Sequence, residues 1–380
     1  MPGAIGHAKT RVEELRPAWG RASPSREQAS VVSSVTIIHV AQRAAVSVKT
    51  VSRVLNGEPY VREELRQRVL EAAKALRFRP RPSARSMAGP RSYVIAYLMT
   101  DPSVPYTGQA QLGALTACRR AGYHLLVESV DTSADDLAAE LESLFTTLDV
   151  DGMLLTPPHG DNPAILDALD QAGIRYVRIA PGGDLDRSAT VDADDRLAAH
   201  AMTSHLLGLG HRRIAFVAGP AAHGASRRRL DGFRQAMADR GVAVDEALVR
   251  EGAFTFPSGL EAANQLLTLA DRPTAVFASN DVMALGVIAT AQRLGLAVPR
   301  DLSVAGFDDA PIAAMVWPSL TTVRHPIAEM AAAAADLLIA RAARDAGPSP
   351  SHSSMHCELI IRESTAPPPG ARPSPGPDRP

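Results

Sequence analysis

Two basic residues at helical spacing have the chemistry needed to read DNA sequence. Lys49 and Arg53 are four positions apart, so a helix would present both on one face. Both side chains suit the O6 and N7 acceptors of guanine, and a methyl group of Val48 suits the methyl of thymine. Together with Val48, Thr50 and Ser52, they give the composition of a helix that inserts its N-terminal half into a DNA major groove.

The surrounding residues predict two short helices joined by a tight turn. Apolar residues recur at three- and four-residue spacing in 37–44 and again in 51–55, so each helix would bury one face. Thr36 can cap the first helix, and Ser47 can cap the second. A third amphipathic helix is predicted at 61–76. Three such helices match a helix-turn-helix domain, and the alternative is a generic helical bundle with solvated basic residues.

The charge of the chain is concentrated in this segment. The 380 residues carry a formal net charge of only −1. Residues 35–89 nevertheless hold 11 Lys or Arg and 4 Asp or Glu, a local charge of +7, so the remainder carries −8. A basic head on an acidic body is typical of a protein that docks one end on nucleic acid.

Composition bounds the class of protein. With 46% hydrophobic residues and a mean hydropathy of −0.04, the chain can bury a large core and should hold more than one domain. Its two cysteines, Cys118 and Cys357, exclude a disulfide framework and indicate a reducing compartment. No apolar run is long enough to span a membrane, and residues 1–17 lack the apolar core of a secretory signal. We therefore expect a cytoplasmic protein.

Common catalytic motifs are missing from the sequence. We find no HExxH, GxSxG or GxxxxGK[ST], and no GxGxxG after a predicted strand. The acidic cluster Asp192-Ala-Asp-Asp195 suggests a metal, but such a cluster at a strand-to-helix junction is more often a helix cap. We expect neither an enzyme nor a bound metal or cofactor.

From residue 93 onward, short apolar strands alternate with longer helices. This alternation predicts parallel sheets covered by helices on both faces. About 270 residues of it exceed one core, so two doubly wound lobes are expected, with a ligand cleft at the carboxyl ends of the strands. Strands are predicted at 93–100, 123–130, 152–157, 175–180, 189–193, 213–218, 274–279, 302–307, 321–325 and 358–363. Helices are predicted at 108–121, 134–147, 163–172, 195–209, 227–240, 258–270, 281–294 and 326–344.

The segment VSVKTVSRVLNG, residues 46–57, resembles the DNA-binding helix of the LacI/GalR family of bacterial repressors. The resemblance implies that some residues face base edges, namely Val48, Lys49 and Arg53, and that others meet phosphates, namely Thr36, Ser47, Thr50 and Asn56. Two positions depart from the family pattern. His39 stands where an acidic residue is usual, and Ala45 stands where the turn usually has glycine.

Residues 77–89 resemble the hinge helix of the same family. Pro82 can open a short helix, and the resemblance implies that Ala84 and Met87 contact DNA. Met87 occupies the position of an apolar wedge that enters the minor groove, where leucine is usual. A flexible linker is the alternative.

The remainder resembles the periplasmic-binding-protein-like effector domain of that family. The motifs that carry this resemblance include GLGH at 208–211, SNDVMALG at 279–286 and VAGFDD at 304–309. The implied fold is an N-terminal all-α helix-turn-helix domain followed by two doubly wound parallel-sheet lobes. The family's lobes are discontinuous, which implies one lobe of about 93–190 plus 322–345 and another of 191–321 plus 355–365.

Four residues match effector contacts of the family. Asp281 follows a predicted strand and opens a helix, where its carboxylate can accept hydrogen bonds from ligand hydroxyls. The resemblance implies that Arg229 binds the effector, that Phe254 stacks on its ring and that Tyr106 forms part of the wall. A helix cap, a surface cation and satellite core residues are the structural alternatives. This set favours a carbohydrate.

Five segments are expected in all. A disordered arm at 1–34, or an upstream start with no structural role, precedes a helix-turn-helix domain at 35–78 and a hinge at 79–90. An effector-binding and dimerisation domain follows at 91–365, and a disordered Pro-rich tail at 366–380.

These features predict a sequence-specific transcriptional regulator, in particular a repressor. It would bind a pseudo-palindromic operator as a homodimer and answer to a small-molecule effector, a sugar in the leading hypothesis. Two alternatives remain open. One is a cytoplasmic sugar-binding or sugar-processing protein with an incidental DNA-binding head, and the other is a regulator that answers to a purine or another non-sugar ligand.

Overall fold

The computed structural model of the chain describes residues 35–55, 60–78, 91–101, 104–132, 136–344 and 351–370. It divides into two compact units, Met1–Pro80 and Arg81–Pro380, and each is described by itself. The predictions for 1–34 and for the hinge at 79–90 lie outside the described residues.

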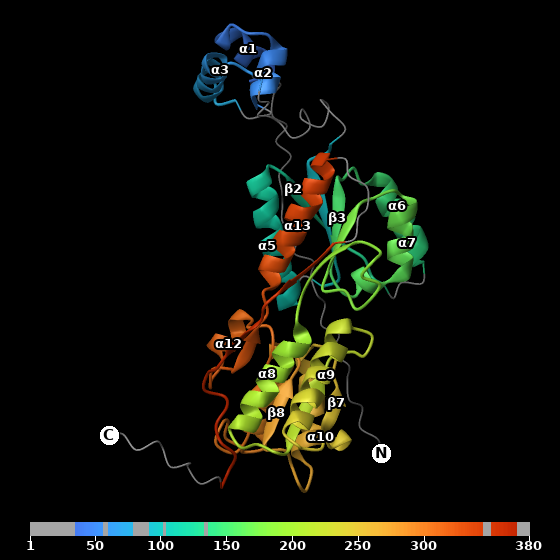
Figure 1. Cartoon of the computed structure of the whole chain (residues 1–380), viewed down its shortest axis with the longest axis vertical. Helices are drawn as coiled ribbons and strands as arrows, with labels where there is room; N and C mark the ends of the chain where they lie inside the picture. Colours follow the sequence, from blue (N-terminus) through green and yellow to red (C-terminus); the bar gives the residue numbers. More distant parts are fainter. Residues whose placement is uncertain are drawn as a thin grey trace, which may run out of the picture. The chain divides into compact units, whose positions relative to one another are not determined.

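In its described residues, the first unit has three helices around a small apolar core (Figure 1). They are α1 (Ile37–Ala44), α2 (Val48–Leu55) and α3 (Glu63–Ala75). The core side chains come from all three helices, as the periodicity predicts: Val40, Ala41, Ala44, Val51, Val54, Val69, Ala72 and Ala73.

Both departures from the family pattern have a local role in this unit. The backbone N–H of Thr36 donates to Nδ1 of His39 at 3.0 Å, so the imidazole fills the role of the usual acidic residue in a capping box. Ala45 ends α1 with φ at 48°, the left-handed region that glycine adopts at lower cost. Arg68 supports this turn by donating to the carbonyl of Ala44 at 2.7 Å.

The second unit begins with a six-stranded, fully parallel sheet of order β11-β5-β4-β3-β1-β2. Its strands are β1 (Val94–Met99), β2 (His124–Ser129), β3 (Gly152–Leu155), β4 (Tyr176–Ile179), β5 (Ala189–Ala193) and β11 (His352–Met355). Four helices cover it in two pairs, α5 (Pro105–Ala121) with α13 (Ile327–Arg344), and α6 (Leu137–Thr147) with α7 (Pro163–Gln171). Figure 1 shows one pair on each side of the sheet. This is the first lobe.

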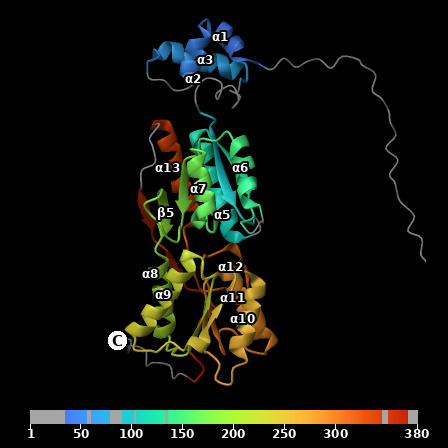
Figure 2. The ribbon, with the colours of Figure 1, turned by 90° about the vertical axis from the view of Figure 1, so that its right-hand side faces the viewer.

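The second lobe is built on a four-stranded parallel sheet of order β7-β6-β8-β9. Its strands are β6 (Ile214–Ala218), β7 (Val249–Glu251), β8 (Ala275–Ala278) and β9 (Ser303–Ala305). Helices α8 (Asp195–Gly208) and α9 (Gly224–Asp239) pack on one face, and α10 (Phe256–Leu267) and α11 (Asp281–Arg293) on the other (Figure 2). The predicted fold of two doubly wound lobes is therefore confirmed.

Short elements connect the lobes and complete the fold. A two-stranded antiparallel sheet pairs β10 (Thr322–Arg324) with β12 (Glu358–Ile360). The chain passes between the lobes three times, after β5, after β10 and after β11. The remaining elements are α12 (Pro311–Met315) and two 3-10 turns, η1 (His159–Asp161) and η2 (Glu246–Leu248).

Lobe boundaries differ from those expected. We placed a boundary at residue 190, but β5 lies whole in the first sheet. We also placed 322 onward in the first lobe, but Val323 of β10 packs in a core cluster of the second. Residue 190 lies inside β5 and residue 322 begins β10, and neither short strand carries a residue pattern that assigns it to one lobe. Sequence reasoning also missed β7, β11 and α12, which are short.

The predicted disordered tail is described only to residue 370. Within that part, the carbonyl of Ala366 accepts hydrogen bonds from Nε2 of His211 and Oγ of Ser303, both at 2.9 Å. Ala366, where the disordered tail was predicted to begin, is therefore hydrogen-bonded to the second lobe. No helix among the described residues is long and apolar enough to cross a membrane.

Candidate functional site

Helix α2 buries one face and presents the other to solvent. Val51 and Val54 are buried in the three-helix core, whereas Lys49 and Arg53 are exposed. Val48 keeps 42% of its surface exposed although it is apolar. The predicted base-reading residues therefore share the outward face of one helix.

The start of α2 is organised by Ser47. Its Oγ accepts a hydrogen bond from the backbone N–H of Thr50 at 3.1 Å and lies 2.9 Å from Oγ1 of Thr50. Ser47 therefore caps the helix, as predicted. Thr36 is exposed at the start of α1. Three other residues predicted to contact DNA lie outside the described residues: Asn56, Ala84 and Met87.

A cavity of about 310 Å³ lies between the two lobes of the second unit. Its lining includes Tyr106 from the first lobe and Arg229, Phe254 and Asp281 from the second. The structure therefore brings together all four residues that were predicted to bind the effector. The volume lies within the range of small-molecule sites.

The walls of the cavity differ between the lobes. The first lobe contributes mainly apolar groups, among them Pro105, Pro157 and Ala180. The second lobe contributes the ring of Phe254, which lies against the backbone of Gly219, where an added Cβ would come within 2.1 Å of the ring. Gly219 thus makes room for an aromatic surface on one side of the cavity.

Asp281 is held by the protein more firmly than we expected. Its side chain is 1% exposed, and its two oxygens accept from the hydroxyl of Thr322 at 2.5 Å and the backbone N–H of Ala310 at 2.7 Å. Burial, followed by the nearby Asp308, raises the pKa of Asp281 well above its usual range. Asp281 therefore organises the wall and offers a ligand only its remaining hydrogen-bonding capacity.

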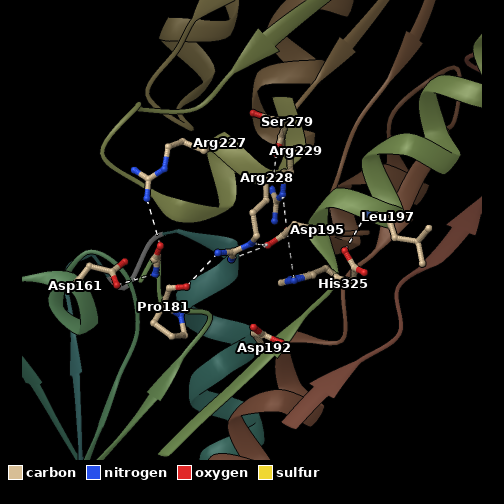
Figure 3. Close-up of polar contacts among 12 residues, drawn as sticks. Asp161, Pro181, Asp192, Asp195, Leu197, Arg227, Arg228, Arg229, Ser279 and His325 are labelled. Atoms are coloured by element: carbon tan, nitrogen blue, oxygen red, sulfur yellow. Dashed lines mark hydrogen bonds and ion pairs between the residues drawn. The ribbon is translucent and has the colours of Figure 1, made fainter. Parts of the chain in front are cut away.

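Arg229 lies in a buried ionic network (Figure 3). It donates from Nε to Asp195 at 2.8 Å and from Nη1 to the carbonyl of Ser279 at 2.5 Å, and its guanidinium stands 3.6 Å from the ring centre of Phe307. Asp195 also accepts from Arg228 at 2.9 Å. Burial raises the pKa of Asp195, but these arginines outweigh it and the net pKa is lowered. The cluster thus remains charged at neutral pH.

The acidic cluster at 192–195 is structural. Asp194 accepts from the backbone N–H of Leu197 at 2.9 Å and so caps α8, while Asp195 belongs to the arginine network. Among the described residues there is no group of three or more His, Cys, Asp or Glu side chains that could hold a metal ion.

Sequence reasoning missed two residues of the cavity, His325 and Asp308. The His325 ring stacks on Tyr106 with centroids 6.3 Å apart, and Asp308 Oδ1 lies 3.5 Å from Nη2 of Arg229. Burial lowers the pKa of His325 to about 4 and raises that of Asp308 to about 7. Asp308 stands in the quoted VAGFDD motif, and His325 follows the short strand β10, so the only available signal was a polar side chain at a strand end.

Several polar atoms at this end of the cavity have few partners within the protein. Within the described part of the chain, Tyr106 Oη and Nδ1 of His325 are buried without a hydrogen-bond partner. Asp308 Oδ1 and Nε2 of His325 make no hydrogen bond either, but they lie 3.5 Å from Nη2 of Arg229 and 3.8 Å from Oδ1 of Asp195, respectively. Buried polar atoms usually have partners, so these groups are available to a ligand. Together they offer a hydroxyl, a neutral imidazole and a carboxyl group.

Comparisons with known proteins find a matching family for each of the two units. Residues 36–81 match the family described as bacterial regulatory proteins, lacI family, and residues 203–365 match the periplasmic binding protein-like domain. The HTH-type transcriptional regulator DegA of Bacillus subtilis (strain 168) is 33% identical over 334 residues, which cover 87% of this chain and 98% of DegA.

Two solved structures are similar over most of their length. A complex of the transcriptional regulator CelR with cellobiose has a TM-score of 0.67 and 31% identity, covering 87% of this chain and 99% of CelR. The lac repressor dimer bound to operator and the anti-inducer ONPF has a TM-score of 0.70 and 25% identity, covering 88% and 99% of the two chains.

Proposed function

Because the chain belongs to the LacI family of bacterial regulatory proteins, we propose that it represses transcription by binding a pseudo-palindromic operator as a homodimer. It is a DNA-binding transcriptional regulator with an effector-binding domain, and its relatives are regulators rather than enzymes. A carbohydrate in the interlobe cavity would control operator binding. A regulator of this kind acts where the chromosome is, in the cytoplasm.

The observation that carries the DNA-binding proposal is the division of α2 into two faces. Val51 and Val54 anchor the helix in the core, so Val48, Lys49 and Arg53 can enter the major groove without disturbing the fold. Asn56, Ala84 and Met87 remain predicted contacts with DNA.

An exposed apolar surface on the second lobe supports a dimer. On and just after α12, Ile312, Met315 and Trp317 are 38%, 75% and 77% exposed. Neighbouring large apolar side chains in contact with water are typical of a protein–protein interface. A second copy of the chain would bury them and place two DNA-binding units on one operator.

The polar end of the cavity supports a hydroxylated effector. A ligand hydroxyl can accept from Tyr106 Oη and donate to Asp308 Oδ1, two buried atoms that make no hydrogen bond within the protein. The ring of Phe254 and the proline-rich wall suit the C–H faces of a sugar. The CelR structure contains cellobiose, which agrees with this class of ligand.

Selection of DNA sequences from a random pool, followed by footprinting, tests the operator proposal. A palindromic consensus bound by the dimer is expected, and binding without sequence preference would refute it. Melting curves of the full chain with ribose, cellobiose and adenosine test the effector, since a ligand at 100 times its Kd should add about 2.7 kcal/mol. A response to adenosine alone would favour the non-sugar alternative.

A further inference from the structure

We propose that the lobes are held closed by a latch formed by the protein itself, between the loop after β4 and the start of α9. This inference rests on the proposed function in one respect, because the latch would regulate access to the effector cavity. The latch consists of Pro181 and Gly182 in the first lobe and of Gly224, Arg227 and Arg228 in the second.

Two arginines of α9 reach across the cleft to backbone carbonyls of the first lobe (Figure 3). Arg228 donates from Nη1 to the carbonyl of Pro181 at 3.1 Å, and Arg227 donates from Nη2 to the carbonyl of Gly182 at 3.3 Å. Arg228 also holds Asp195, so its guanidinium is fixed before it meets the other lobe. Both hydrogen bonds join one lobe directly to the other.

Two glycines let the backbones of the lobes approach closely at the same place. A Cβ added at Gly224 would lie 2.2 Å from Cα of Gly182, and one added at Gly182 would lie 3.1 Å from Cα of Gly224. No φ between +20° and +160° is found at either residue, so backbone conformation does not require glycine there. The requirement is the close approach of the two lobes.

The loop that carries Pro181 and Gly182 is braced from beneath by Arg178, which is 1% exposed. Its guanidinium donates to Oγ of Ser188 at 2.9 Å, to the carbonyls of Gly160 and Gly183 at 3.3 and 3.1 Å, and to the carbonyl of Asp184. Burial lowers the pKa of Arg178. The loop is therefore a preformed surface, and closure requires docking rather than folding.

The latch and the cavity share their elements. The cavity is lined by Ala180 of the braced loop, by His223 at the N-cap of α9, and by Ala225 and Arg229 of α9. Breaking the latch therefore moves two walls of the cavity apart. An effector enters or leaves when the latch opens.

Gly224→Ala tests the latch without removing any polar contact. The added methyl overlaps the other lobe, while alanine near the start of α9 suits the helix. Gly183→Ala is the matched control, because it lies on the same loop, adopts no positive φ and has no atom within 4 Å of the added Cβ. Arg227→Gln is a second, milder perturbation.

Spin labels at exposed Glu142 of α6 and exposed Asp231 of α9 report the distance between the lobes in the full chain. Cys118 and Cys357 are replaced by alanine in every sample, so that only the two introduced cysteines react. Without ligand, we expect a predominantly short distance in the unaltered and Gly183→Ala chains. Gly224→Ala should shift the ratio of closed to open lobes toward open by about tenfold or more, and Arg227→Gln should shift it less.

Identical distance distributions for Gly224→Ala and Gly183→Ala would overturn the latch, as would an open population in the unaltered chain. Operator binding of the same chains is measured in parallel. If no chain binds DNA specifically, including the unaltered one, the proposed function is refuted. The spin-label distances would still decide whether the latch exists.

Discussion

Replacing Arg229 with methionine should strongly destabilise the second unit. Arg229 is 3% exposed and is the link among Asp195, the carbonyl of Ser279 and Asp308. Methionine has a similar length but no charge, so Arg228 is the one arginine left to Asp195, and Asp308 loses its cation. Removing one partner of a buried ion pair costs about 3–5 kcal/mol, because the other charge stays buried.

Urea unfolding of the full chain, followed by far-UV circular dichroism, measures this change. The midpoint for Arg229→Met should fall by roughly 1 M or more. Arg234→Met is the matched control, since Arg234 lies on the same helix, is exposed and pairs with the exposed Glu246 rather than with the first lobe. Surface substitutions usually change stability by less than about 0.5 kcal/mol.

A double replacement separates the loss of the ion pair from a simple loss of packing. Asp195→Asn is therefore combined with Arg229→Met. The loss of stability in the double variant should be smaller than the sum of the losses in the two single variants, because neither Asp195 nor Arg229 is then left as a buried charge without the other. The reasoning is refuted if the free energy of unfolding of Arg229→Met lies within about 1 kcal/mol of that of Arg234→Met.

Other perturbations address the remaining sites. Burial raises the pKa of Asp308 to about 7, so the folded chain keeps a proton that the unfolded chain loses near pH 4. Relative to Asp308→Asn, the unaltered chain should therefore lose stability between about pH 4 and 7, by up to about 1.4 kcal/mol per pH unit in urea unfolding; a constant difference would contradict the assignment. Against His325→Gln the trend should reverse between about pH 4 and 6.5, because burial lowers the pKa of His325 to about 4 and the folded chain rejects a proton that the unfolded chain binds. Lys49→Ala should lose about 1–3 kcal/mol of affinity for the selected operator and little for scrambled DNA in gel-shift titrations, with exposed Lys74→Ala on α3 as the control; equal losses on both DNAs would exclude base reading. Trp317→Glu should convert the dimer to monomer in analytical ultracentrifugation, whereas Phe256→Glu, at a position 40% exposed on α10, should not; a persistent dimer would place the interface elsewhere.

The helices of the DNA-binding unit could be predicted closely because burial and periodicity coincide there. Val51 and Val54 lie on one face of α2 and Lys49 and Arg53 on the other, which spacing alone indicates. His39 shows the limit of the same reasoning. Its type departs from the family pattern, yet the imidazole nitrogen accepts from the backbone of Thr36 as a carboxylate would.

The gathering of the four residues predicted to bind the effector could be anticipated, but their partners could not. Asp281 is hydrogen-bonded to Thr322 and Ala310, which are 41 and 29 positions away in the chain. Spacing along a sequence carries no information about such contacts. His325 and Asp308 were missed for the same reason, since each acts through neighbours that only the folded chain brings close.

Three consecutive arginines show most clearly why local sequence was insufficient. Residues 227–229 look like a solvated run of charge, but successive residues of a helix point about 100° apart, so each side chain meets a different target. Arg227 reaches Gly182, Arg228 bridges Pro181 and Asp195, and Arg229 turns inward to the buried network. One turn of α9 thus joins the cavity wall to the contact between the lobes. The same turn of the helix therefore carries a residue that lines the cavity and both arginines that contact the first lobe.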